Sequence, residues 1–153
     1  MRAAFCAGRA SRRGALVLGL VLGLGGPLQA QGHAELERVL ERVGSAWARG
    51  DVSALVAHAC AEGVSLELNG GATGPLSNRK AAAALRRLFD DAETEGVRAG
   101  MAHIVGGSPA RAFGEIAWVF RVDGTSQPER RRVFVALVQE DGAWRVTQIR
   151  LLR

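Results

Sequence analysis

His103 is the residue of this sequence best suited to acid–base chemistry, because the pKa of an unperturbed imidazole is about 6.5. The alternating pattern around it predicts a strand that places Met101, His103 and Val105 on one side, which we assign to the helices and a pocket. A general base also needs a positioned partner. Glu67 and Glu115 are available, but Glu115 is expected to face outward. His103 is therefore a candidate catalytic and ligand-binding residue, with a core histidine satisfied by its neighbours as the favoured alternative.

Arg130, Arg131 and Arg132 form the one run of three basic residues. The favoured interpretation is a charged strand entry that discourages edge pairing. Arg132 would meet an anionic ligand if its side chain pointed inward. Trp118 is a candidate for stacking on a planar ligand, although packing is the usual role of a tryptophan at a strand position that faces a core. Arg132 and Trp118 are therefore ligand-binding candidates beside His103.

The sequence predicts neither a metal nor a cofactor. His33, His58, His103 and Cys60 form none of the motifs typical of zinc sites. The glycine pairs lack the Gly-Lys-Ser/Thr ending of a phosphate-binding loop. We expect Cys60 to be a small apolar residue buried on a helix, with a reactive thiol as the alternative.

The first thirty residues have the order of a secretory signal peptide. Four arginines precede an apolar run at residues 15–24, which is followed by Gly-Gly-Pro and a small-residue ending at Ala30. Ten apolar residues are too few for a transmembrane helix. Cleavage after Ala30 removes four of the 20 Lys and Arg residues and none of the 15 Asp and Glu residues, so the mature chain is nearly neutral. We therefore expect an exported protein, periplasmic or extracellular, that binds neither nucleic acid nor membrane after the signal is removed.

Residues 31–153 have the length of one domain. Its firmest feature is a hairpin around Asp141-Gly142, whose strands are apolar on both sides and so need a cover on each. Helices are expected at 33–49, 52–60 and 80–90, and strands at 64–68, 97–105, 111–121 and on both sides of the hairpin turn. This order indicates an α+β fold, with three N-terminal helices packed on a strongly curved, mainly antiparallel sheet.

Several local motifs occur in a characteristic order. They are Ala46-Trp47-Ala48-Arg49-Gly50-Asp51, Gly63-Val64-Ser65-Leu66, Lys80 to Phe89 and Gly142-Ala143-Trp144-Arg145-Val146. In these residues the chain resembles the nuclear-transport-factor-like superfamily, which has a cone-shaped α+β barrel fold shared by ketosteroid isomerases and polyketide-cyclase-like proteins.

A second set of residues resembles, more narrowly, a family of small exported bacterial proteins of unknown function. This set comprises Ser77, Leu88-Phe89, His103, Gly106-Gly107-Ser108, Gly114 and Gln148-Ile149-Arg150-Leu151. Together the two likenesses cover about residues 36–152. They imply a pocket between the helices and the concave sheet, and often a homodimer through the outer face of the sheet.

The isomerase chemistry itself is not expected. The position of the general base corresponds to Leu68, its neighbour Glu67 points to the opposite face, and the chain has no Tyr. Because this scaffold hosts many functions, three hypotheses stay open. The favoured one is non-catalytic binding of a small molecule or a partner in the cone. The others are an enzyme of the cyclase, dehydratase or isomerase type that uses His103 with a carboxylate, and a pure assembly domain with a filled cone.

Overall fold

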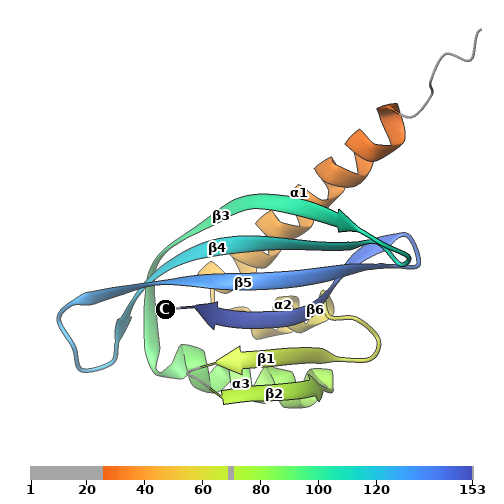
Figure 1. Cartoon of the computed structure of the whole chain (residues 1–153). Coiled ribbons are helices and arrows are strands. Elements are labelled where there is room, and N and C mark those ends of the chain that lie inside the picture. Colours follow the sequence, from red (N-terminus) through yellow and green to blue (C-terminus); the bar gives the residue numbers. More distant parts are fainter. Residues whose placement is uncertain (1–25, 69–70, 153) are drawn as a thin grey trace, which may run out of the picture.

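The computed structural model describes residues 26–68 and 71–152, in which three helices accompany a long twisted sheet (Figure 1). The elements are α1 (Gly26–Ala48), α2 (Val52–Ala57), β1 (Val64–Leu68), β2 (Gly71–Leu76), α3 (Asn78–Asp90), β3 (Ala92–Gly106), β4 (Arg111–Val122), β5 (Pro128–Glu140) and β6 (Ala143–Leu152). The described strands form one sheet in the order β2-β1-β6-β5-β4-β3. Its neighbours are antiparallel except β1 and β6, which are parallel. The predicted α+β class with a mainly antiparallel sheet is confirmed.

Helix α1 buries the predicted apolar face against the sheet. At most 1% of the surface of Leu36, Leu40, Val43 and Trp47 is exposed. The spacing of these residues follows one side of a helix, so their burial accounts for the helical conformation. The helix begins at Gly26, earlier than expected. The predicted signal peptide lies mostly outside the described residues, and cleavage after Ala30 stays a prediction.

Helix α2 is shorter than expected because the chain after it joins the sheet. The Asp51 carboxylate accepts a hydrogen bond from the backbone N–H of Ala54 at 3.0 Å and caps its start. After Ala57 the backbone carbonyl of His58 accepts from the N–H of Val146 at 2.7 Å, and the N–H of Cys60 donates to the carbonyl of Val146 at 3.0 Å. These bonds to β6 replace the next helical turn.

The hairpin of β5 and β6 confirms the firmest prediction. Its turn contains Asp141 at φ 50° and Gly142 at φ 77°, the left-handed conformations that a tight hairpin turn requires.

Elsewhere the ladder is interrupted. Strand β3 starts at Ala92, before the expected residue 97, and its pairing with β4 shifts register three times, including between Ala99 and Ala102. Such shifts bend a strand and increase its twist.

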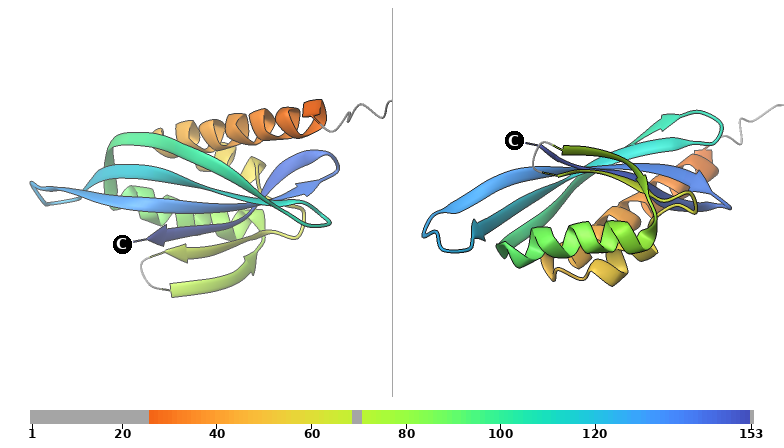
Figure 2. Two further views of the ribbon diagram at one scale, coloured as in Figure 1. Left: turned by 45° about the horizontal axis from the view of Figure 1, so that its top comes forward. Right: turned by 90° about the horizontal axis from the view of Figure 1, so that it is seen from below.

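The core lies between the helices and one face of the sheet. Seen edge-on, α1, α2 and α3 lie on the same side of the sheet (Figure 2, right). Aromatic side chains fill the middle of this layer. The Trp47 ring centroid lies 5.1 Å from that of Phe89 and 5.5 Å from that of Trp118, and the rings of Trp118 and Phe120 stack at 3.9 Å. We call the opposite face, which the helices leave uncovered, the outer face.

The two outermost strands of the sheet are both irregular. Strand β2 contains Pro75, which has no N–H to donate to a further strand. Strand β3 carries the three register shifts described above. Neither of these edge strands therefore presents an unbroken row of free backbone N–H and C=O groups to a further strand.

Candidate functional site

His103 lies on the outer face, and its predicted position against the helices is wrong. The prediction assumed unbroken alternation along the strand. The register shift between Ala99 and Ala102 reverses the alternation, because one inserted residue moves all following side chains to the other face. As a result Ala102 is 2% exposed on the helix side, while Met101 is 75% exposed. His103 is exposed and pairs with Phe113 of β4.

Trp118 faces the helices as expected, but its side chain is fully buried. Its indole N–H donates a hydrogen bond to the hydroxyl of Thr94 at 3.0 Å, and its ring packs between Trp47 and Phe120. No face of the ring is open to a planar ligand. Packing therefore explains this residue, and its candidacy for ligand stacking lacks structural support.

Arg132 lies on the outer face, so the inward orientation considered for it is wrong. Its guanidinium contacts the Glu115 carboxylate at 3.4 Å, and both side chains are largely exposed. The neighbouring Arg131 points to the helix side, where its guanidinium lies 6.0 Å from the Phe120 ring centroid. Glu115 faces outward, as predicted.

An aromatic row crosses the outer face. It consists of His103 on β3, Phe113 on β4 and Phe134 on β5. The ring centroids of His103 and Phe113 are 5.1 Å apart, and those of Phe113 and Phe134 are 5.7 Å apart. Phe113 must face away from the helices, because a Cβ atom on its neighbour Gly114 would lie 2.5 Å from Leu40 of α1. The hairpin whose strands are apolar on both sides was the sequence signal for an apolar outer face. Alternation alone did not predict that His103, Phe113 and Phe134 would lie next to one another.

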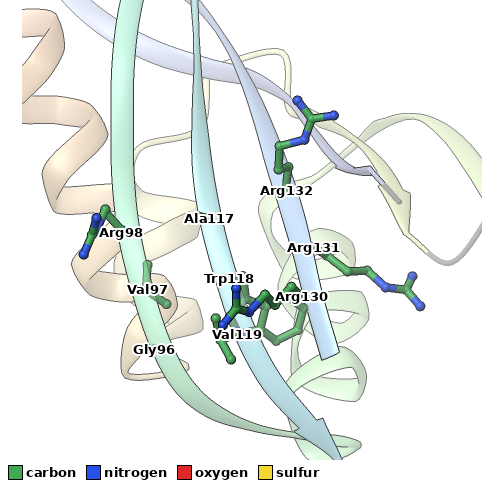
Figure 3. Close-up of a pocket in the computed structure, with 9 residues that line it drawn as sticks. All are labelled: Gly96, Val97, Arg98, Ala117, Trp118, Val119, Arg130, Arg131 and Arg132. Carbon is green, nitrogen blue, oxygen red and sulfur yellow. The ribbon is translucent and has the colours of Figure 1, made fainter. Parts of the chain in front are cut away.

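A hollow of about 550 Å³ lies beside the aromatic row, over β3, β4 and β5 (Figure 3). Arg98, Arg130 and Arg132 come from the two strands that flank β4, and we call this site the arginine hollow. Arg98 and Arg132 both pair with Ala117, whose methyl group leaves space between them. In the part of the chain that the structure describes, neither Arg98 nor Arg130 has a carboxylate within ion-pair distance. The run Arg130 to Arg132 was the sequence signal for this hollow. Nothing in the sequence indicated that Arg98 would lie beside these arginines.

A second hollow, also of about 550 Å³, lies at the opposite end of β4 and β5 and is also lined by β6. It is bordered by Glu62, Glu140 and Arg111. The Glu140 carboxylate accepts a hydrogen bond from the backbone N–H of Ala61 at 3.3 Å. Cys60 also borders this hollow, but its buried thiol donates to the carbonyl of Gly63 at 2.7 Å. The prediction of a buried cysteine is confirmed, although the residue lies beyond the end of α2.

Among the described residues, neither His103 nor His58 contacts a carboxylate, and the histidine–carboxylate contact of His33 with Glu37 at 3.4 Å lies on the exposed side of α1. Glu67 on β1 bonds to Arg150 at 2.5 Å, and β1 lies four strands from β3, roughly 19 Å away at about 4.8 Å per strand. Burial, reinforced by Arg42 and Arg145, lowers the pKa of His58, which lies outside both hollows.

Within residues 26–68 and 71–152 no three His, Cys, Asp or Glu side chains gather as a metal site would require. None of the helices in these ranges is long and apolar enough to span a membrane.

Comparison with solved structures identifies the fold. A DUF4783 family protein from Bacteroides ovatus superposes with a TM-score of 0.57 at 20% identity, over 72% of this chain and 90% of that chain. A ketosteroid isomerase-like protein from Erwinia carotovora atroseptica gives a TM-score of 0.64 at 18% identity, over 79% and 95%. A domain of unknown function with a cystatin-like fold from Nostoc punctiforme gives 0.57 at 15% identity, over 82% and 76%.

The chain has the nuclear-transport-factor-like fold. The predicted resemblance is thereby confirmed at the level of the fold, and proteins of a family of unknown function are among the similar structures. Neither a protein-family model nor a curated protein matches the sequence. Because the nuclear-transport-factor-like fold hosts many functions, the function of this chain has to be argued from its own residues.

Proposed function

We propose that the chain is a non-catalytic assembly domain in which two copies pair through the outer face of the sheet. The observation that carries this proposal is the contrast between the two faces. Aromatic side chains fill the helix side, whereas the outer face presents an aromatic row with no helix over it. A sheet that is apolar on both sides needs a second cover.

The filled cone weighs against a ligand or a reaction on the helix side. Trp47 and Trp118 are 0% exposed and meet edge to face with Phe89 in the space where a cone pocket would lie. His103, which the enzyme hypothesis needs, lies on the opposite face. The carboxylate nearest in register is Glu115 on the adjacent strand, and it pairs with Arg132.

The outer face has the extent that a stable pair requires. Four strands, β3 to β6, at roughly 4.8 Å spacing and about ten residues of roughly 3.3 Å each cover roughly 600 Å² before side-chain relief is counted. Side chains raise the accessible area toward the roughly 800 Å² that each partner buries in an interface of standard size. Phe113 and Phe134 lie near the middle of this area, where interfaces concentrate their binding energy.

We further propose that the domain acts after export. This rests on the signal-like sequence of residues 1–30. The buried face of α1 starts at Leu36, so cleavage after Ala30 removes no residue of the described core. The carbonyl of Gly32, which accepts a hydrogen bond from the Trp144 indole at 3.3 Å, would remain in the mature chain.

Replacing Phe134 by Arg tests the pairing. Phe134 is half-buried on the outer face, so the substitution places a charge at the centre of the interface without entering the core. Sedimentation equilibrium should show a dimer for the unchanged chain and a monomer for Phe134→Arg, because an unpaired charge in an interface costs several kcal/mol, on the order of 2–5. Ala83→Arg is the matched control, because Ala83 is exposed on α3, on the other side of the molecule.

Circular dichroism must show that both variants stay folded. A monomeric unchanged chain would contradict the proposal. A dimer that survives Phe134→Arg would also contradict it, because association would then use another surface.

A further inference from the structure

We propose that the arginine hollow binds the phosphate group of a phosphate monoester, whose organic part lies on Ala117 and Val119 of β4. This site goes beyond the pairing of two copies and does not need it, because all residues that line the hollow belong to one chain. Its volume of about 550 Å³ lies within the range of small-molecule sites, roughly 300–1,000 Å³.

The carboxylates on the strands around the hollow are already bound to other arginines. In the described residues these ion pairs are Glu93 and Glu95 with Arg121, Glu115 with Arg132, and Glu129 with Arg131. Arg98 and Arg130 are therefore left without a counter-ion among the described side chains. Because Glu115 balances Arg132, the hollow has a surplus of two positive charges.

This surplus favours a ligand group with two negative charges. A phosphate monoester carries about −1.5 to −2 charges at pH 7 and has three strongly accepting oxygens. A phosphate diester, an organic sulfate ester and a single carboxylate each carry only one charge. Guanidinium groups also donate pairs of N–H groups whose geometry matches phosphate oxygens. The charge and the donors of the hollow therefore both fit a phosphate monoester.

The three arginines surround the space above Ala117. Arg98 and Arg132 both pair with Ala117, so their backbones lie two strand spacings or roughly 10 Å apart. Half of this distance is less than the length of an extended arginine side chain. The side chain of Arg130 already reaches over β4 (Figure 3). That of Arg98 points away from β4 in the same view, but it is exposed and can rotate toward a bound anion.

The floor between the arginines is apolar and low. Ala117 is exposed, and Val119 is half-buried two residues further along β4. Gly96 on β3 pairs with Val119, and no heavy atom of the described residues lies within 4 Å of a Cβ atom built there. These three positions leave room for an aromatic ring or a short alkyl chain beside the charges. A phosphate held against such a floor is partly shielded from water, which strengthens its attraction to the arginines.

The hollow lies at the margin of the proposed pairing area. Ala117 is four residues from Phe113 along β4, or roughly 13 Å, whereas Phe113 and Phe134 lie near the centre of that area. The hollow also reaches β3, the outermost strand on this side of the sheet. A ligand can therefore enter from the edge of the sheet when a second copy covers the middle.

Calorimetric titration of the mature chain with phenyl phosphate tests the site. Arg98→Ala and Arg130→Ala should each weaken binding by about tenfold, because each removes a charge-assisted hydrogen bond. The matched control is Arg86→Ala on α3, which removes an exposed arginine from the other side of the molecule and should leave the affinity unchanged. Circular dichroism checks that all variants stay folded.

Related probes test the chemical class of the ligand. Methyl phenyl phosphate keeps the ring but has one charge, and it should bind about tenfold more weakly than phenyl phosphate. Inorganic phosphate should also bind more weakly, because it makes no contact with the floor. Gly96→Leu, which fills the space beside Val119, should remove the advantage of phenyl phosphate over inorganic phosphate. Succinate that binds as tightly as phenyl phosphate would overturn the assignment to a phosphate group.

Two results would overturn the site itself: no saturable binding of phenyl phosphate, or equal affinity in the unchanged chain, Arg98→Ala and Arg130→Ala. Sedimentation velocity on the same samples separates this outcome from a failure of the pairing. A dimer that Phe134→Arg disrupts but that binds no phenyl phosphate refutes the site while the pairing stands. A monomer that binds phenyl phosphate refutes the pairing while the site stands.

The phosphate monoester can belong to a soluble compound or to the headgroup of phosphatidic acid. We expect a soluble compound, because a paired outer face has no access to a flat lipid surface. Flotation with phosphatidylcholine vesicles that contain phosphatidic acid should then leave the protein behind. Flotation that Arg130→Ala abolishes would overturn the soluble source and assign the same phosphate chemistry to a lipid headgroup.

Discussion

Replacing Gly114 by Ala tests whether the space between α1 and the sheet is filled. A Cβ atom at this position would lie 2.5 Å from Cδ2, 3.0 Å from Cδ1 and 3.3 Å from Cγ of Leu40. Leu40 is 1% exposed, so its side chain can retreat only within the core. Overpacking of this kind typically costs about 1–3 kcal/mol, which corresponds to a melting temperature lower by about 4–12 °C for a domain of this size.

Thermal and urea unfolding, followed by circular dichroism at one fixed protein concentration, measure this loss. Gly74→Ala is the matched control, because no heavy atom of the described residues lies within 4 Å of a Cβ atom at Gly74. Leu40→Ala alone should cost about 2–5 kcal/mol. In the Gly114→Ala background it should cost less, because the new methyl group occupies part of the vacated space.

A Gly114→Ala variant as stable as the unchanged chain would refute the reasoning. It would show that Leu40 has room to retreat and that α1 does not close tightly on β4. The filled cone, on which the proposed assembly function depends, would then lose its support.

Two further predictions concern a tryptophan pair and a histidine. Trp47 is fully buried and its indole N–H has no acceptor among the described residues, whereas the indole of Trp118 donates a hydrogen bond to a threonine. Trp47→Phe should therefore lower the unfolding free energy less than Trp118→Phe does, by about 1 kcal/mol. Equal losses in urea unfolding would contradict this prediction. Burial, with Arg42 and Arg145 nearby, holds the pKa of His58 below its ordinary value of 6.5. The unfolded chain then binds more protons, so the stability from His58 is full above pH 6.5 and is lost as the pH falls toward the folded pKa. His58→Gln should flatten the fall in unfolding free energy as the pH drops below about 7, and an unchanged slope would count against the assignment.

The sequence was sufficient for the parts of the fold that depend on regular periodicity. The face of α1 and the turn at Asp141 and Gly142 were predicted because helix spacing and turn chemistry are local properties. The order of the elements then restricted the fold to an α+β arrangement. The observed sheet and the similar structures agree with that prediction.

The face of His103 could not be predicted because a bulge in β3 intervenes. The residues at this bulge include Ala99, Gly100 and Ala102, whose small side chains give no contrast between buried and exposed positions. Gly100 was the one available signal. A Cβ atom there would lie 2.9 Å from the carbonyl oxygen of Glu115, and a glycine inside a strand often marks a bulge or a close backbone approach.

The arginines of the hollow were only partly predictable for a similar reason. The run Arg130 to Arg132 was visible, but the inward side chain is Arg131 and not Arg132. Which of two neighbouring residues faces the core depends on the pairing of β5 with β4, and that pairing is set by contacts distant in the sequence. Arg98 joins the group only through the same pairing.

The irregular edges of the sheet limit how this protein can associate. Pro75 on β2 and the bulges of β3 hinder a neighbouring molecule from adding a strand at either margin. Open-ended growth into ribbons or fibrils is thereby disfavoured, even though the molecule carries a large apolar sheet. A contact between broad faces is self-limiting, since the first partner covers the surface that a second would need. The bulge that displaced His103 from the interior would thus also help to restrict the number of copies to two.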